Sequence, residues 1–208
     1  MVGTVNSFFV GSVSTLVATA LGTLAALGLS RPHMPYKGLI MSILISPMIV
    51  PLIITAAGMF FFYAKVNLVY TFTGIILAHV ALSTPFVVIT VTATLVGFDT
   101  NMTKASQSLG ARPVRTFFKV IMPLILPGVI SGALFAFITS FDEVVIVMFM
   151  ASLDQLTIPK QMWAGIRQEI SPVILCMATC LVALSIFLLT TVELLRRRSE
   201  KLRGITQR

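Results

Sequence analysis

Five long stretches without a charged side chain constrain this sequence more than any other feature. They cover residues 1–30, 38–64, 66–98, 120–141 and 170–192. Each is longer than the roughly 20 residues with which an α-helix crosses the ~30 Å hydrocarbon layer of a bilayer. Backbone groups in lipid must bond within the protein, and no alternating β-barrel pattern occurs, so the stretches predict membrane-spanning α-helices.

The composition agrees with this interpretation. Hydrophobic residues make up 57% of the 208 residues and charged residues 11%, unlike an ordinary soluble domain. We therefore expect an all-α transmembrane protein in which residues 1–208 form one domain. Its five spanning helices are expected at about 5–29, 39–63, 69–95, 121–149 and 171–195.

Lysine and arginine are distributed unevenly between the two sides of these predicted helices. Lys65, Lys160 and Arg167 fall on one side. Twelve fall on the other side: Arg31, Lys37, Lys104, Arg112, Arg115, Lys119, Arg196, Arg197, Arg198, Lys201, Arg203 and Arg208. By the positive-inside rule the richer side is cytoplasmic, which predicts a cytoplasmic C-terminus and an outer N-terminus. Because these cations flank apolar runs, the net charge of +8 indicates a lipid bilayer and no nucleic-acid partner.

An outer N-terminus without a preceding cation is unusual, since nothing in residues 1–7 would start membrane insertion. We therefore expect a first helix to be missing. The alternative, a secretory signal peptide, is disfavoured because the first stretch lacks a basic n-region and exceeds the ~7–15 residues of an h-region.

Three prolines lie inside the predicted spans, at Pro47, Pro51 and Pro85. A proline frees a backbone carbonyl, so each either kinks its helix or marks a moving part of a pathway, and both interpretations are open. Gly128 and Gly132 recur at four-residue spacing in the fourth stretch, which predicts close helix packing in lipid.

A polar and basic segment, residues 99–123, separates the third and fourth stretches. Its first half predicts a two-turn helix with an apolar stripe from Met102 to Leu109, ended by Gly110 in a left-handed conformation. Pro113 is well placed as the first residue of a second helix. A helix this short must pack on something, either the ends of its own spans or another protein. A connector with a solvated basic face is the alternative.

The spacing within this segment resembles a known motif. From Lys104 to Pro123 the chain reads Lys-Ala-Ser-x3-Gly-x9-Val-x-Met-Pro, which is similar to the EAA loop of ABC importer permeases, Glu-Ala-Ala-x3-Gly-x9-Ile-x-Leu-Pro. In that family the loop is a coupling helix that docks into a groove on the ATPase subunit. The resemblance implies ATPase coupling for Lys104, Ala105, Ser106, Leu109, Gly110 and Pro123.

The resemblance extends along nearly the whole chain. The stretches NSFFVGSVSTLVATALGTLAALGLSR, HVALSTPFVVITVTATLVGFD and SFDEVVIVMFMA are similar to the second permease of spermidine/putrescine-type importers. This implies the type I importer fold, without cofactor, in a bacterial inner membrane. The implied partners are a homologous permease, two ATP-binding subunits and a periplasmic or extracellular substrate-binding protein. The family's usual N-terminal sixth helix has no counterpart here, which agrees with the charge distribution.

The chain departs from the motif at its first residue, where Lys104 replaces Glu. A cation near a helix N-terminus opposes the helix dipole, and the capping-box carboxylate is lost. We hypothesise that Lys104 meets an acidic position on the ATPase.

Two adjacent carboxylates, Asp142 and Glu143, interrupt the fourth apolar stretch. Charges at such depth are rare, so a functional site is the first interpretation. On a continuous helix the two side chains would point ~100° apart, so only one could face a pathway fully. Attraction of a cationic substrate and an interhelical bond that positions this helix are both open.

Two further residues have competing interpretations. His79, alone within a span, is interpreted as a packed, hydrogen-bonded side chain in preference to a proton relay. Trp163 is either an interfacial anchor or part of an outer gate or binding-protein contact.

No phosphate-binding loop, HExxH motif or His/Cys cluster occurs in the sequence. We therefore expect no enzyme activity, no metal and no cofactor, with ATP hydrolysis in a partner subunit. The favoured function is a polyamine permease. The alternatives are a permease for another solute delivered by a binding protein, a self-contained transporter or channel, and a membrane-embedded enzyme.

Overall fold

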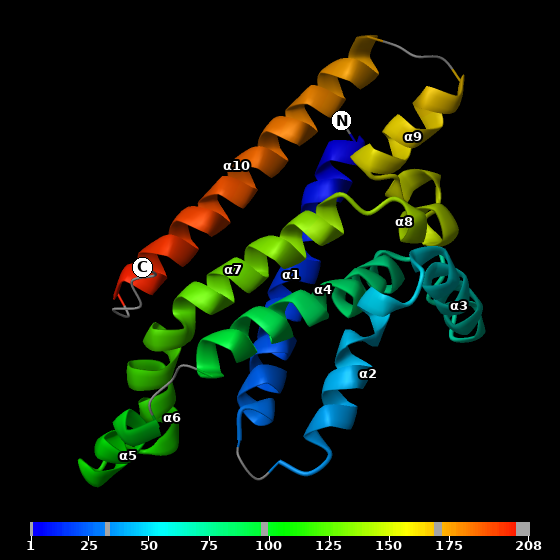
Figure 1. Cartoon of the computed structure of the whole chain (residues 1–208). Helices are drawn as coiled ribbons and strands as arrows, with labels where there is room; N and C mark the ends of the chain where they lie inside the picture. Colours follow the sequence, from blue (N-terminus) through cyan, green and yellow to red (C-terminus); the bar gives the residue numbers. More distant parts are fainter. Residues whose placement is uncertain (1, 32–33, 97–99, 169–171, 203–208) are drawn as a thin grey trace.

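A computed structural model describes residues 2–31, 34–96, 100–168 and 172–202, and within these residues it contains helices and no strands (Figure 1). The helices are α1 (Val2–Leu29), α2 (Lys37–Ile49), α3 (Leu52–Lys65), α4 (Phe72–Val96), α5 (Thr100–Ser108), α6 (Pro113–Thr116), the π turn η1 (Phe117–Ile121), α7 (Met122–Phe141), α8 (Val145–Met150), the 3₁₀ turn η2 (Leu153–Gln155), α9 (Ile158–Gln168) and α10 (Pro172–Leu202).

The core is formed where α1, α4 and α7 pack against one another, which small residues make possible. A methyl group on Gly22 would approach the Cβ of Val87 in α4 to 2.6 Å, and one on Gly132 would approach the Oγ1 of Thr90 to 2.5 Å. Two α4 threonines at this contact satisfy their hydroxyls on their own helix: Thr90 donates to Phe86 O at 2.9 Å, and Thr94 donates to Thr90 O at 2.9 Å. The helices therefore pack closely here and the Thr90 hydroxyl stays hydrogen-bonded.

One end of this bundle is covered by the short segments that follow α7. Asn6 Nδ2 donates to Asp154 O at 2.8 Å, and the Ser7 hydroxyl accepts from Ile158 N at 2.8 Å. Lys160 Nζ donates to Val147 O at 3.3 Å, and burial lowers the pKa of this lysine. The segment from α8 to α9 is thus fixed to the N-terminal end of α1.

The helix expected at 39–63 is broken in the structure. The axes of α2 and α3 differ by 104° across Val50 and Pro51. Val50 is extended, with ψ 136°, as expected before a proline, and Pro51 has no N–H to continue the helix. Pro47 and Pro85, in contrast, lie inside α2 and α4.

The helix expected at 121–149 also differs from the structure at both ends. The helical segment runs from Pro113 to Phe141, because α6 continues through η1 into α7. Pro123 has no N–H for the carbonyl of Lys119, and directly before it Met122 N donates to Phe117 O in a π turn. The chain then leaves the helix at Asp142.

Among the described residues, three helical segments are long and apolar enough to cross a membrane: Val2–Leu29, Phe72–Val96 and Pro113–Phe141. The bent pair α2 and α3 passes the same test together, and the described apolar part of α10 is Leu175–Thr191. In Figure 1, α5, α6, the end of α1 and the start of α2 lie at one end of the bundle, toward which the C-terminal end of α10 points. The helices α8 and α9 and the start of α1 lie at the other end. This arrangement groups the segments that the charge distribution predicted to share one side.

Candidate functional site

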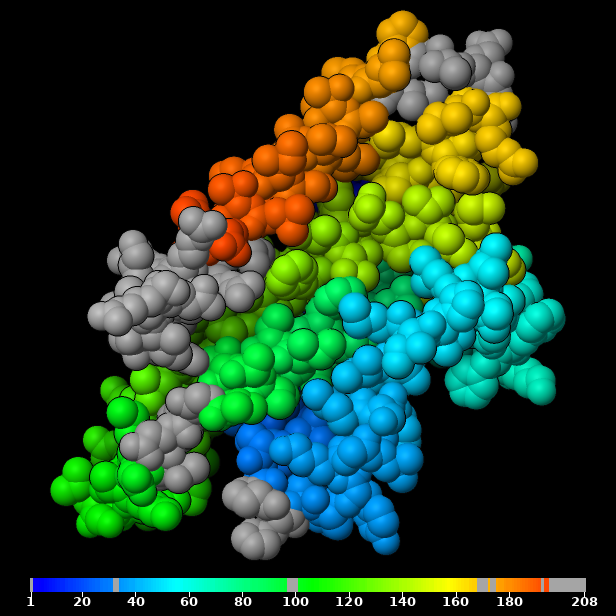
Figure 2. Space-filling model, in the orientation of Figure 1, coloured from blue at the N-terminus to red at the C-terminus, as the bar shows by residue number. Residues whose placement is uncertain are grey.

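Between α4 and α7, residues 100–121 form a helical hairpin, with α5 as its first arm and α6 with η1 as its second. The hairpin lies at one end of the molecule (Figure 2). Its first helix, α5, ends in a Schellman motif, in which Ala111 N donates to Ser106 O at 3.1 Å and Gly110 N donates to Gln107 O at 2.9 Å. Gly110 has φ +80°, which confirms the predicted left-handed helix end. Residue 99, the predicted first residue of the loop, lies outside the described residues.

The second arm begins at Pro113, as predicted, and is continuous with α7. The Ser106 and Thr116 hydroxyls are 3.1 Å apart and join the two arms. Thr116 is buried, and the sequence analysis did not predict a role for it. The available signal was its hydroxyl, one turn after Pro113 in the arm that faces Ser106. Because no flexible segment separates Pro113 from Phe141, the hairpin is attached directly to a core helix.

The apolar stripe of α5 does not pack on the chain's own spans. Met102 is 49% exposed and Leu109 is 89% exposed. The second arm exposes Val114 and Phe118 in the same way. The hairpin is also basic: Lys104, Arg112, Arg115 and Lys119 are all exposed, and residues 100–121 contain no acid.

Lys104 is the fifth of the nine residues of α5, which corrects the expectation that it opposes the helix N-terminus. The helix dipole acts mainly within the first turn, so Lys104 costs α5 less than expected. Ala105 is exposed beside it, and Pro123 is exposed as the second residue of α7.

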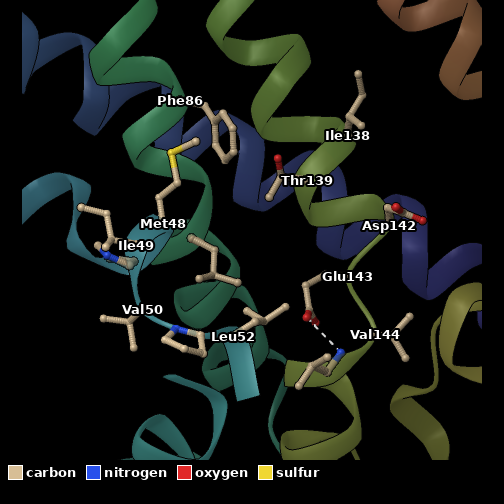
Figure 3. Close-up of a pocket in the computed structure, with 14 residues that line it drawn as sticks. Met48, Ile49, Val50, Leu52, Phe86, Ile138, Thr139, Asp142, Glu143 and Val144 are labelled. Atoms are coloured by element: carbon tan, nitrogen blue, oxygen red, sulfur yellow. Dashed lines mark hydrogen bonds between the residues drawn. The ribbon is translucent and has the colours of Figure 1, made fainter. Parts of the chain in front are cut away.

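The two helix breaks meet at one cavity of about 760 Å³ (Figure 3). Its walls come from α2, α3, α4, α7, the start of α8 and the two breaks, and most of its lining is apolar. The lining residues are Pro47, Met48, Ile49, Val50, Pro51, Leu52, Leu82, Phe86, Ile138, Thr139, Asp142, Glu143, Val144 and Val145.

Asp142 and Glu143 occupy the break between α7 and α8 and do not lie on one continuous helix, which corrects the expected geometry. Asp142 is exposed at the edge of the cavity, and in Figure 3 its carboxylate points away from the labelled residues of α2 and α3. Glu143 is only 6% exposed. Its carboxylate accepts from the backbone N of Val145 and of Ile146, both at 2.9 Å, and so caps α8.

Behind the break lies His79 of α4, whose Nδ1 is 2.7 Å from the Ser140 hydroxyl. Its Nε2 is 3.9 Å from Oε2 of Glu143. The interpretation of His79 as a buried, hydrogen-bonded side chain is confirmed. Its partner Ser140 was missed, although a serine just before the acidic pair was a usable signal.

Solved structures define the class of protein to which this fold belongs. A chain of the MetNI methionine ABC transporter in an inward-facing conformation superimposes with a TM-score of 0.65 over 99% of this chain and 95% of that chain, at 19% identity. A chain of an amino acid ABC transporter crystallised with histidines gives 0.65 over 94% and 92%, at 18% identity. Within the described residues the fold is therefore that of an ABC importer permease, as predicted.

The family follows from the sequence comparison. Residues 18–201 match the family described as binding-protein-dependent transport system inner membrane component, and the chain belongs to this family. It is thus a multi-pass permease subunit of a binding-protein-dependent ABC importer in the inner membrane.

Three curated relatives similar to this chain are transport permeases. The spermidine/putrescine transport system permease protein PotC of Haemophilus influenzae is 30% identical over 94% of this chain and 76% of the relative. PotC of Escherichia coli K12 is 29% identical over 94% and 74%. The putrescine transport system permease protein PotI of the same strain is 28% identical over 83% and 64%.

Proposed function

We propose that the chain transports polyamines such as spermidine and putrescine through the cavity at its two helix breaks. The observation that carries this proposal is the similarity to spermidine/putrescine permeases over 94% of the chain, together with an acid at the edge of an apolar cavity. The chemistry fits, because a polyamine alternates ammonium groups with methylene segments.

The cavity offers a complement to both parts of such a substrate. Met48, Leu82, Phe86 and Ile138 supply apolar surface for methylene groups. Asp142 supplies an exposed carboxylate at the edge, and a charge beside apolar walls raises the local concentration of a cationic substrate. Glu143 has its oxygens engaged by α8, so in this conformation Asp142 is the better candidate for direct contact with substrate.

The hairpin formed by α5 and α6 is proposed to couple transport to ATP hydrolysis in a partner. Its exposed Met102 and Leu109 present an apolar stripe suited to a groove, and its four exposed cations favour an acidic rim on that groove. The continuity of the second arm with α7 supports transmission of movement from this hairpin to Asp142 at the far end of the same helical segment.

The assembly that we propose contains this permease, a homologous permease, two ATP-binding subunits and a binding protein on the outer face. The C-terminus and the hairpin face the cytoplasm in this arrangement. The distribution of twelve cations on one side and three on the other supports this orientation.

The test of the substrate is uptake of radiolabelled spermidine by cells that lack their own polyamine importers and express the complete transporter. We expect Asp142→Asn to raise the KM for spermidine about tenfold, the change for a lost charge-assisted contact of ~1.4 kcal/mol. Asp154→Asn is the matched control, since Asp154 is an exposed acid outside the cavity and its loss should leave KM unchanged. Equal KM values for the Asp142 variant and the unmodified chain would exclude a direct substrate role.

A further inference from the structure

One buried side chain on α4 contacts both sides of the break between α7 and α8. His79 Nδ1 is 2.7 Å from the hydroxyl of Ser140, in the last turn of α7. His79 Nε2 is 3.9 Å from Oε2 of Glu143, which caps the first turn of α8. The His79 and Glu143 side chains are 0% and 3% exposed, so water does not screen this contact.

The two ring nitrogens of His79 fit different partners. Nε2 has no hydrogen-bond partner, and an unpaired buried polar atom is costly. A neutral ring with its proton on Nε2 fits both neighbours best: Nδ1 accepts the Ser140 hydroxyl proton, while the Nε2–H faces the Glu143 carboxylate beyond hydrogen-bond distance. The attraction at 3.9 Å is weaker than a hydrogen bond but acts in a dry, low-dielectric surrounding.

The residues that reach the cavity depend on this arrangement. Asp142 and Val144 line the cavity on either side of Glu143, whereas His79 does not line it. The helical hydrogen bonds stop on either side of Glu143: Asp142 N donates to Ile138 O at 3.0 Å, and Val144 O accepts from Met148 N at 2.9 Å. The contacts of the Glu143 side chain therefore fix the angle at which the two helix ends meet.

We propose that His79 is a positioning residue that, through Glu143, sets the geometry of the α7–α8 break and hence the position of Asp142 at the cavity. It acts from behind the cavity wall and does not touch substrate. The consequence for transport rests on the proposed function, but the geometry itself can be tested without any substrate.

The test uses thiol labelling of the full chain in native membranes. Cys176 and Cys180, the only cysteines in the sequence, are replaced by serine, and Val144→Cys then reports on the break. We expect His79→Leu to change the labelling rate of this cysteine by about threefold or more, the change for loss of a contact comparable to a modest hydrogen bond. His79→Gln, whose amide retains a donor and an acceptor, should restore much of the original rate.

A double-mutant cycle separates positioning from simple packing. If His79 acts through Glu143, adding His79→Leu to Glu143→Gln should change the rate little beyond Glu143→Gln alone. Ser83→Ala is the matched control, because Ser83 is buried one turn further along α4 and donates to Ala136 O at 3.2 Å, within α7. Its effect on the Val144→Cys rate should be small and independent of Glu143.

Three results would overturn the proposal: an unchanged rate in His79→Leu, effects of His79→Leu and Glu143→Gln that simply multiply, or an equal effect of Ser83→Ala. If His79→Leu does not reach the membrane, Ser140→Ala takes its place and must shift the rate in the same cycle. A failure to transport spermidine would leave these labelling results intact, so the two proposals fail separately.

Discussion

The packed interface between α4 and α7, which we call the seam, and the hairpin formed by α5 and α6 follow one another in the sequence. They differ in how tightly their residues are packed. At the seam, Gly128 lies so close to Thr94 and to the carbonyl of Thr90 that a methyl group has no space. In the hairpin, Gly110 has no atom within 4 Å of an added Cβ, and Leu109 is 89% exposed.

The difference shows what each glycine does. At the seam, Gly128 allows two helices to pack closely because it has no side chain. In the hairpin, Gly110 allows the backbone to adopt a positive φ angle. A region packed this tightly suits a rigid element, and a region this exposed suits a surface that becomes buried only against a partner. The following predictions test this contrast.

The largest effect is expected for Gly128→Val. The added side chain would overlap Thr94, and its Cβ alone would lie 3.2 Å from the carbonyl oxygen of Thr90. Overpacking of this kind costs ~1–3 kcal/mol. We expect a lower thermal midpoint for the detergent-solubilised chain and less chain in the membrane. Gly58→Ala is the control, since nothing lies within 4 Å of that position in α3, and it should leave the midpoint unchanged or raise it. Equal behaviour of the two variants would contradict the rigid seam.

Gly110→Ala is expected to act next most strongly, without overlap of atoms. At φ +80° an L side chain strains the backbone by ~1–2 kcal/mol, which would shift or fray the end of α5. Chain abundance should stay normal while co-purification of the ATPase falls several-fold. Gly110→Asn, which tolerates this conformation better, should recover much of the binding. If Gly110→Ala lowered the abundance of the chain and left ATPase binding unchanged, Gly110 would have a packing role like that of the seam glycines.

Lys104→Glu tests the proposed acidic partner surface. Since Lys104 is exposed and lies beyond the first turn of α5, its reversal should alter the partner contact and leave the hairpin intact. An exposed ion pair is worth ~0.2–1 kcal/mol, so ATPase binding should fall up to about fivefold, and less at high salt. A Lys104→Glu variant that assembles and transports like the unmodified chain would remove any special role for this lysine.

Ser106→Ala should have the smallest effect, because it removes one bond between two partly exposed arms. Loss of the contact with Thr116, at 3.1 Å, should destabilise the hairpin by only ~0.5 kcal/mol, the low end for a hydrogen bond, because the contact is partly exposed. Faster hydrogen exchange confined to α5 and α6 would report it. Faster exchange in α7 as well would show that the hairpin and the seam are coupled more closely than their packing indicates.

Much of the fold could be predicted from local sequence. Gly110 and Pro113 act through their own backbone preferences, so the hairpin's helix end and its second start were predictable. The spanning stretches were visible as uncharged runs. Pro51 was recognised, but nothing local distinguished it from Pro47 and Pro85, which stay inside helices, because tertiary packing decides whether the chain turns after a proline.

The site was less predictable, for a similar reason. Asp142 and Glu143 were found as charges in an apolar run, but their division into an exposed acid and a buried cap depends on where α7 ends. The side chain that contacts Ser140 and Glu143 at that end comes from α4: it is His79, which lies 64 positions before Glu143 in the sequence. Pairing over such a separation cannot be read from spacing within one segment.

The most direct test of the central claim is ATP-driven accumulation of radiolabelled spermidine in proteoliposomes that contain this chain with its co-purified subunits and binding protein. The account predicts accumulation that requires ATP and is competed by putrescine but not by methionine. Accumulation of methionine without spermidine, from the same preparation, would contradict it.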